Sequence, residues 1–256
     1  MKPVPCLAMS SPDISSVTAD ATLALFLDVD GTLLEIAETP DAVVVPTPLK
    51  DALNSLSSRL DGALALISGR SISTLDALFD PYRFTAAGIH GCERREASGC
   101  IMRPEIDLER FASVRAQLAE WSRQHPGTLL EDKRYALALH YRQVPHLESA
   151  ARDEVLSVLP ELATHELQPG KFVFELRPFG YTKGTAIDAF MHESPFRGRI
   201  PLFIGDDVTD EAGFAVVNQL GGLSIRVGEP TQTAARHQFP GVNEVVRWLT
   251  ELSRRT

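Results

Sequence analysis

Several features are scarce in this 256-residue sequence, and each scarcity excludes a class of protein. The net charge is −9 and no block of Lys and Arg occurs, so we expect no nucleic-acid or anionic-membrane partner. The three cysteines, Cys6, Cys92 and Cys100, form no CxxC pair, which argues against a disulfide framework or a zinc site and for reduced cytoplasmic thiols. No apolar run reaches about 18 residues, so no membrane span is predicted. An acidic chain that binds an anionic ligand needs a local cation.

The N-terminal segment also lacks the continuous apolar core of a signal peptide, because Pro, Ser and Asp occur throughout the segment. We therefore expect residues 1–20 to be a disordered leader and the protein to be cytoplasmic. The hydrophobic share of 44% is enough for a sizeable core in one or two domains.

Short apolar runs with helical patterns between them predict an α/β core. Three short runs end at or next to an Asp or a Gly: "ALFLDV" (24–29), "ALALIS" (63–68) and "PLFIGD" (201–206). Such nearly continuous runs are typical of central parallel strands that are covered on both faces. Leucines at helical spacing over 47–60 separate the first two runs and predict a strand–helix–strand unit. A closing helix is expected over 242–255.

The middle of the chain has a different pattern. A helix is expected over 107–124, with one apolar face, and two segments that follow it alternate between apolar and polar residues, 135–142 and 171–178. Alternation predicts an antiparallel sheet with one buried face, backed by helices. The helix face consists of Leu108, Phe111, Leu118 and Trp121. The buried strand faces consist of Leu137, Leu139, Tyr141, Phe172, Phe174 and Leu176. We expect an α+β domain at 92–178, inserted into a core made of 21–91 and 179–256.

The stretch "LDVDGT" at the end of the first run has two interpretations. Asp-Gly favours a hairpin turn, so the segment could simply reverse the chain. Alternatively, Asp28 and Asp30 project from the strand end toward one point, Gly31 lets backbone amides approach an anion, and Thr32 adds a donor.

The stretch "FIGDDVTDE" places Asp206, Asp207 and Asp210 after another apolar run. Because Asp favours N-caps, an acidic helix start is the alternative interpretation. Five carboxylates at two strand ends repel one another unless a cation lies between them. Oxygen-only clusters of this kind suit Mg²⁺.

Two further stretches supply candidate phosphate ligands. In "LISGRS", Ser68, Gly69 and the following amides could hold a phosphate, although turns often contain Ser-Gly. In "FGYTKGTAIDAF", Lys183 stands at an expected helix start, where the positive end of the dipole disfavours a cation. Its position indicates that Lys183 faces negative charge, and it is the local cation that an acidic chain requires.

Four elements of the sequence resemble, in the same order, the four motifs of the haloacid-dehalogenase-like hydrolases. They are Asp-x-Asp-Gly-Thr, Ser, Lys and Gly-Asp-Asp-x-x-x-Asp. The middle insertion resembles the cap domains that lie between their second and third motifs. Three segments more specifically resemble the trehalose-6-phosphate phosphatase family: "GIHGCE" (88–93), "EDKRYALALHYR" (131–142) and "KFVFELRPFGYTKG" (171–184). The main departure is Cys92, at a position that varies in the family.

This resemblance implies a Rossmann-like parallel-sheet core with an α+β cap, and an Mg²⁺-dependent phosphatase. Asp28 would attack phosphorus to form an aspartyl phosphate, and Asp30 would protonate the leaving sugar oxygen and then activate water. A carboxylate oxygen of Asp28, the backbone carbonyl of Asp30 and Asp206 would hold the metal. Asp207 and Asp210 would act through water or by orienting Lys183.

The resemblance also assigns the ligand contacts. Gly31, Thr32, Ser68, Gly69 and Lys183 would hold the phosphate. The sugar, trehalose 6-phosphate, would be bound by Glu131, Lys133, Arg142, Lys171, Glu175, His90 and Glu93. On pattern alone, a solvated sheet face carrying ion pairs is the favoured interpretation of these charged cap residues, and the family resemblance reverses that preference.

Three alternatives are open at this point: another sugar phosphatase, a phosphomutase of the same superfamily, or a non-catalytic sensor or synthase-binding subunit. The presence of both Asp28 and Asp30 disfavours the last. Association with a trehalose-6-phosphate synthase is not decided by the sequence.

Overall fold

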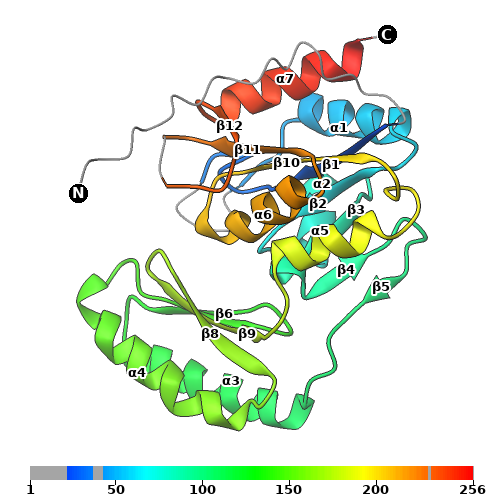
Figure 1. Ribbon diagram of the computed structural model, residues 1–256. Helices are drawn as coiled ribbons and strands as arrows, with labels where there is room; N and C mark the ends of the chain where they lie inside the picture. The colour runs from blue at the N-terminus through cyan, green and yellow to red at the C-terminus, as the bar shows by residue number, and fades with distance from the viewer. Residues whose placement is uncertain (1–21, 37–42, 230–231, 256) are drawn as a thin grey trace, which may run out of the picture. The chain divides into compact units, whose positions relative to one another are not determined.

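The computed structural model describes residues 22–36, 43–229 and 232–255 (Figure 1). The chain divides into two compact units: one contains the chain up to Ile101 and from Thr182 onward, and the other is Met102–Tyr181. The expected leader at residues 1–20 lies outside the described residues. Within the described residues, no helix is both long and apolar enough to cross a membrane.

The first unit is built on an eight-stranded sheet in the order β12-β11-β10-β1-β2-β3-β4-β5. The strands from β12 to β3 are parallel, and β4 pairs antiparallel with β3. The strands are β1 (Leu23–Leu27), β2 (Leu64–Ile67), β3 (Thr85–Gly88), β4 (Glu93–Arg95), β5 (Ile101–Met102), β10 (Ile200–Gly205), β11 (Leu223–Val227) and β12 (His237–Phe239). The predicted Rossmann-like parallel core is confirmed.

Helices cover both faces of this sheet. α1 and α7 pack together on one face, and α5 and α6 pack together on the other (Figure 1). The helices are α1 (Thr47–Arg59), α2 (Ile72–Phe79), α5 (Lys183–Met191), α6 (Glu211–Gln219) and α7 (Val242–Arg254), with short 3-10 helices η3 (Ile89–Gly91) and η6 (Val208–Asp210). The helices expected over 47–60 and 242–255 are confirmed.

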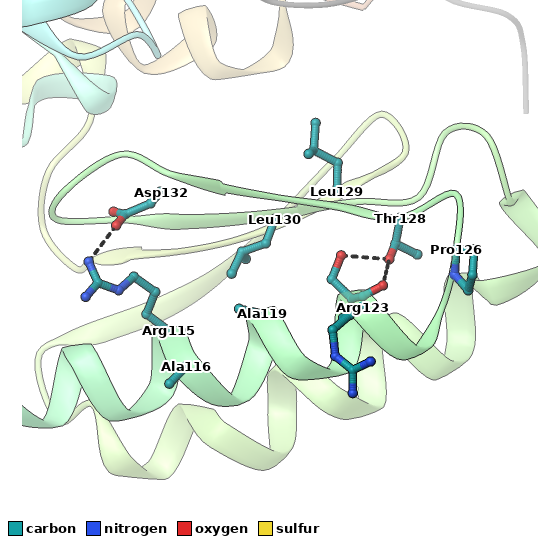
Figure 2. A pocket seen from close by; sticks show the side chains of 10 residues that line it. Arg115, Ala116, Ala119, Arg123, Pro126, Thr128, Leu129, Leu130 and Asp132 are labelled. Carbon is teal, nitrogen blue, oxygen red and sulfur yellow. Dashed lines mark hydrogen bonds and ion pairs between the residues drawn. The ribbon is translucent and has the colours of Figure 1, made fainter.

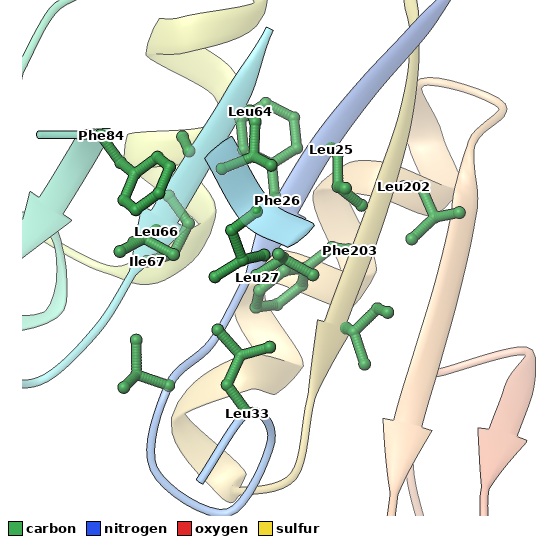
Figure 3. Packing of buried hydrophobic residues seen from close by; sticks show 14 of the residues in the cluster. Leu25, Phe26, Leu27, Leu33, Leu64, Leu66, Ile67, Phe84, Leu202 and Phe203 are labelled. Atoms are coloured by element: carbon green, nitrogen blue, oxygen red, sulfur yellow. The ribbon is translucent and has the colours of Figure 1, made fainter. Parts of the chain in front are cut away.

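The core of the first unit centres on β1, between β2 and β10. Leu25, Phe26 and Leu27 are fully buried, and their neighbours on the adjacent strands enclose them (Figure 3). A strand covered on both faces must be apolar at every position, which explains its continuous run. Leu27 stands opposite both Ile204 of β10 and Leu66 of β2, so the three strands end at the same edge of the sheet.

The second unit is a four-stranded antiparallel sheet in the order β6-β7-β9-β8. Its strands are β6 (Leu129–Asp132), β7 (Leu137–His140), β8 (His165–Gly170) and β9 (Val173–Pro178). α3 (Leu108–Gln124) and α4 (Glu148–Val158) cover one face (Figure 1). Phe111, Leu118, Leu139, Tyr141 and Phe174 belong to the apolar core between these layers. The sheet-and-helix arrangement of an α+β unit is therefore present.

Some details differ from the sequence-based expectation. The insertion was expected to begin at residue 92, but β4 belongs to the sheet of the first unit, and the second unit begins at Met102. The sequence "ERR" of β4 has no apolar run, so periodicity does not reveal this strand. Leu108 is 68% exposed, because it opens the first turn of α3, and Val114 takes part in the buried face instead. Lys171 lies in the turn before β9 and not in the strand.

Candidate active site

The carboxyl ends of three adjacent parallel strands bring predicted site residues together. Asp28 directly follows β1, Ser68 follows β2 and Asp206 follows β10. The backbone N–H of Asp28 donates to the carbonyl of Ile204, 2.9 Å away, which ties the end of β1 to β10. Ligands bind beyond the carboxyl ends of the strands in open parallel sheets. A hairpin turn alone therefore does not explain "LDVDGT", because Asp28 lies close to a group that follows another strand, Asp206.

Three carboxylates form an acidic cluster at this edge. Asp28, Asp206 and Asp210 each place an oxygen within 4.8 Å of the others, and Asp28 and Asp210 are buried. Gly31 makes room for Asp206: its φ is +82°, and a Cβ there would lie 2.2 Å from a carboxylate oxygen of Asp206. Any larger residue would displace Asp206 from the cluster.

Lys183 is the cation of the cluster. Its Nζ donates to Oδ1 of Asp28 at 2.5 Å and to Oδ1 of Asp210 at 2.7 Å, and its side chain is 3% exposed. α5 begins at Lys183, with Thr182 and Thr185 forming a reciprocal capping box. α5 packs closely on α6 at Gly184, where a Cβ would lie 2.5 Å from the carbonyl of Ala212. This close packing places the Lys183 ammonium beside the carboxylates.

The cluster perturbs its own titration. Burial raises the pKa of Asp28 well above its usual value; Lys183 opposes this increase, and the charges of Asp210 and Asp206 add to it. Burial and the charge of Asp210 together raise the pKa of Asp206 to about 6. Burial alone would lower the pKa of Lys183, but the carboxylates of Asp210 and Asp28 raise it above its ordinary value. Lys183 therefore stays charged, and the cluster carries an excess of acidic groups.

The other two aspartates after β10 have separate contacts. One oxygen of Asp210 accepts from Lys183, and the other accepts from the backbone N–H groups of Asp206 and Asp207, at 3.1 and 2.9 Å. These bonds orient Asp210 and occupy both of its oxygens. Asp207 is exposed and accepts from the N–H of Val208 as the N-cap of η6. The N-cap interpretation of this stretch is thus correct for Asp207.

Asp30 has a partner that sequence reasoning did not assign. Its carboxylate accepts two hydrogen bonds from Arg70, from Nε at 2.7 Å and from Nη2 at 2.7 Å. Arg70 belongs to the turn that also contains Ser68 and Gly69. The stretch "LISGRS" contains Arg70, but the pairing of Arg70 with Asp30 depends on the adjacency of β1 and β2.

The remaining candidate phosphate ligands lie beside the cluster. Ser68 is buried, and its Oγ accepts from the N–H of Arg70 at 3.1 Å. A Cβ on Gly69 would lie 2.7 Å from the ring of His90, so the imidazole lies directly against this turn. Thr32 is buried, and its hydroxyl donates to Asp206 at 3.4 Å, which is a contact within the cluster.

Glu93, expected at a hinge and as a sugar contact, lies in β4 and is 4% exposed. One of its carboxylate oxygens accepts from the N–H of Ile72, the first residue of α2, at 2.9 Å. A carboxylate at a helix N-terminus is a stabilising arrangement. This contact ties β4 to the start of α2, and a sugar contact by Glu93 stays a prediction.

In the second unit, the sheet face opposite the helices carries paired charges. Glu131 accepts from Nε2 of His140 at 2.9 Å, and Nζ of Lys133 lies 3.3 Å from Oε1 of Glu175. Ala138 of β7 stands between Glu131 and Glu175 in the strand register, so the three residues form one row across the sheet. His140 is the member of this group that was not among the expected sugar contacts.

The two other expected cap residues lie at the periphery. Arg142 follows the end of β7 and is exposed, with its guanidinium 5.5 Å from the ring centroid of Phe172. Lys171 is exposed in the β8–β9 turn. Both residues lie outside the strands, unlike Glu175.

A groove of about 670 Å³ lies elsewhere in this unit, between α3 and the edge strand β6 (Figure 2). Arg115 of α3 and Asp132 of β6 form an ion pair of 2.9 Å across it. The groove is on the helix side of β6, whereas Glu131 points to the opposite face. None of the expected sugar contacts lines it.

An acidic cluster at the ends of β1 and β10, in a parallel sheet interrupted in sequence by an α+β unit, defines the class of haloacid-dehalogenase-like hydrolases. Solved structures match this fold: the C-terminal domain of Candida albicans trehalose-6-phosphate phosphatase aligns with a TM-score of 0.76 at 22% identity, over 93% of both chains. A family model described as trehalose-phosphatase matches residues 26–239. This chain belongs to the trehalose-phosphatase family.

Relatives of known name support the assignment. The chain is 46% identical to the trehalose-6-phosphate phosphatase of Escherichia coli K12, over 94% of this chain and 90% of that protein. It is also 46% identical to a probable trehalose-phosphate phosphatase of Sinorhizobium fredii, over 87% and 84% of the two chains. A solved trehalose-6-phosphate phosphatase related protein matches with a TM-score of 0.73 at 28% identity, over 90% of this chain and 96% of that one.

Proposed function

We propose that this protein is an Mg²⁺-dependent phosphatase that hydrolyses trehalose 6-phosphate to trehalose and phosphate, the last step of trehalose synthesis. The observation that carries the proposal is the meeting of Asp28 and Asp206, at the ends of adjacent strands, with Lys183 at the start of α5. The named activity of the relatives supports the choice of substrate.

The residues at this edge fit a magnesium ion. Three carboxylates converge, and the pKa of Asp206 is raised to about 6 by burial and by the charge of Asp210, so a cation would relieve repulsion there. Asp28, Asp206 and the backbone carbonyl of Asp30 would hold the ion, while Asp210, with both oxygens engaged, would orient Lys183. When bound, Mg²⁺ supplies positive charge against the phosphoryl oxygens.

The chain's own residues would divide the reaction into two steps. Asp28 attacks phosphorus, and the bond between phosphorus and the sugar oxygen breaks, leaving an aspartyl phosphate. Asp30 first gives a proton to the departing oxygen and then takes one from the water that hydrolyses the acyl phosphate. Lys183, Ser68 and the turn amides of Gly31 and Gly69 stabilise negative charge on the phosphoryl group.

The sugar would be read by the polar face of the second unit. Glu131 and Glu175 flank Ala138 in the strand register, and together with Lys133 they would make charge-assisted hydrogen bonds to sugar hydroxyls. Arg142 and Lys171 are proposed to act at the edge of this surface. His90 is proposed to contact the ligand from its place against Gly69.

A panel of sugar phosphates, with phosphate release measured with and without Mg²⁺, tests the proposal. We expect turnover of trehalose 6-phosphate to exceed that of glucose 6-phosphate by at least 100-fold. Equal rates on the two would instead favour a less specific sugar phosphatase, and transfer of phosphate between sugar positions would favour a phosphomutase. Binding without turnover would favour a sensor or a synthase-associated subunit.

A further inference from the structure

Arg70 and Asp30 form an ion pair at the strand ends, outside the acidic cluster. Two parallel hydrogen bonds of 2.7 Å join the guanidinium fork to both carboxylate oxygens. The Arg70 side chain is 12% exposed and that of Asp30 is 35% exposed. A bidentate pair fixes the plane of the carboxylate as well as its distance. Arg70 therefore determines how the Asp30 carboxyl is turned.

The backbone of Arg70 is itself held from two sides. Its N–H donates to Oγ of Ser68 at 3.1 Å, and its carbonyl accepts from the N–H of Ile89 at 2.9 Å. The N–H of His90 donates to the carbonyl of Ser68, also at 2.9 Å. The turn that contains Ser68 and Arg70 is thus hydrogen-bonded at both of these residues to Ile89 and His90.

The segment 88–93 adopts an uncommon conformation to make these bonds. Ile89, His90 and Gly91 have successive φ angles of +50°, +54° and +106°. A β-branched residue rarely adopts a positive φ, and such residues persist only where the surroundings hold them. The left-handed turn directs two N–H groups at the carbonyls of Arg70 and Ser68, and Glu93 then caps α2 through Ile72.

We propose that Arg70 is a positioning residue for Asp30, and that the turn at 89–91 serves the reaction by fixing Arg70. This inference rests on the proposed function, in which Asp30 moves the proton. In the first step, the phosphorus–sugar bond breaks and a phosphorus–oxygen bond to Asp28 forms. Oδ1 of Asp30 gives up its bond from Nη2 of Arg70 and carries the proton that passes to the sugar oxygen, while Oδ2 keeps its bond from Nε, so the carboxyl stays oriented. Without the guanidinium, the Asp30 side chain rotates more freely and meets the leaving oxygen less often.

The leaving group provides the test. A sugar alkoxide needs a proton to depart, whereas p-nitrophenolate does not. In Arg70→Ala we expect kcat on trehalose 6-phosphate to fall roughly 100-fold with little change in KM, the range of a lost acid–base contribution. The rapid first release of p-nitrophenolate from p-nitrophenyl phosphate should fall less than about fivefold. Added guanidinium ion should restore part of the trehalose 6-phosphate activity, and Arg70→Lys should retain more than Arg70→Ala.

A double-mutant cycle separates action through Asp30 from a structural effect. If Arg70 acts through Asp30, then Arg70→Ala has no further effect on kcat in an Asp30→Asn background. Arg94→Ala is the matched control, because Arg94 makes an equally short bidentate pair with Glu193 and its side chain is 14% exposed. It should lose comparable thermal stability but show no dependence on the leaving group.

Several results would overturn the proposal. Equal losses of first-turnover rate on both substrates would mean that Arg70 binds the phosphate or stabilises the fold. Higher activity in Arg70→Ala would mean that the pair with Asp30 inhibits the reaction. If the wild type hydrolyses aryl phosphates but not trehalose 6-phosphate, the proposed substrate fails. A series of phenyl phosphates with different leaving groups then still tests Arg70 independently.

Discussion

The ammonium of Lys183 lies between two buried carboxylates, 2.5 Å from Asp28 and 2.7 Å from Asp210, although 155 residues separate it from Asp28 in the chain. One cation thus joins α5 to the end of β1 and to the turn after β10. Because all three groups are buried, these ion pairs should both set the charge of the site and stabilise the fold.

Removing that cation should cost stability as well as activity. Lys183→Met leaves Asp28 and Asp210 buried without their shared partner, and breaking such an interaction costs on the order of 3 to 5 kcal/mol. Urea unfolding measures the loss. Lys50→Met is a control, since the Lys50 ammonium is exposed and bonds only a backbone carbonyl among the contacts described. Similar stability of the two variants would show that the buried pairs contribute little.

Asp28→Asn should abolish turnover without unfolding the protein. The amide keeps the size of the side chain but cannot attack phosphorus. We expect at least a 1,000-fold loss, since removing a nucleophile can cost roughly 10⁶-fold. Phosphate release and circular dichroism together check this. Full activity in the variant would remove Asp28 from the role of nucleophile.

Metal removal should silence the enzyme reversibly. EDTA is expected to stop phosphate release and Mg²⁺ to restore it. Mg²⁺ at a hundred times its Kd should also stabilise the fold by about 2.7 kcal/mol. Asp206→Asn should lose most of this stabilisation, while Asp188→Asn, on the exposed face of α5, should keep it. Activity that survives EDTA, with no thermal shift, would refute the metal assignment.

The polar face of the second unit should control KM for the sugar. Glu131→Gln removes a charged acceptor, and the loss of one charge-assisted hydrogen bond, about 1.5 to 3 kcal/mol, raises KM roughly 10- to 100-fold. Hydrolysis of p-nitrophenyl phosphate should not change. Asp132→Asn is the matched control, since Asp132 is the next residue of β6 but pairs with Arg115 on the helix side. Equal effects of the two variants would contradict sugar recognition by this face.

His165 should make stability sensitive to acid. Burial lowers its pKa below the usual value, although a hydrogen bond with the carbonyl of Tyr135 opposes this. The unfolded chain therefore binds the proton more readily, so stability is complete above the unfolded pKa of about 6.5 and is lost as pH falls below it. Urea midpoints for His165→Gln should depend less on pH than those of the wild type. The exposed His146→Gln should not differ from the wild type.

Local patterns in the sequence predicted the central strands of the core and the aspartates and the lysine that the structure brings together at their ends. The apolar runs before Asp28, Ser68 and Asp206 predicted strands because a strand buried on both faces has no polar positions. Lys183 was identified from its unfavourable place at a helix start. These properties depend on neighbours in the chain, and so they can be read without a structure.

The tertiary structure alone decided which of these groups pair with one another. The pairing of Arg70 with Asp30 and the insertion of Asp206 beside Gly31 depend on strand order and register, which connect residues 40 and more than 170 positions apart. β4 and the capping role of Glu93 were missed for the same reason, because a strand of charged residues is stable only through its partners. Periodicity determines which face of an element is apolar; only packing determines what the polar groups of that element touch.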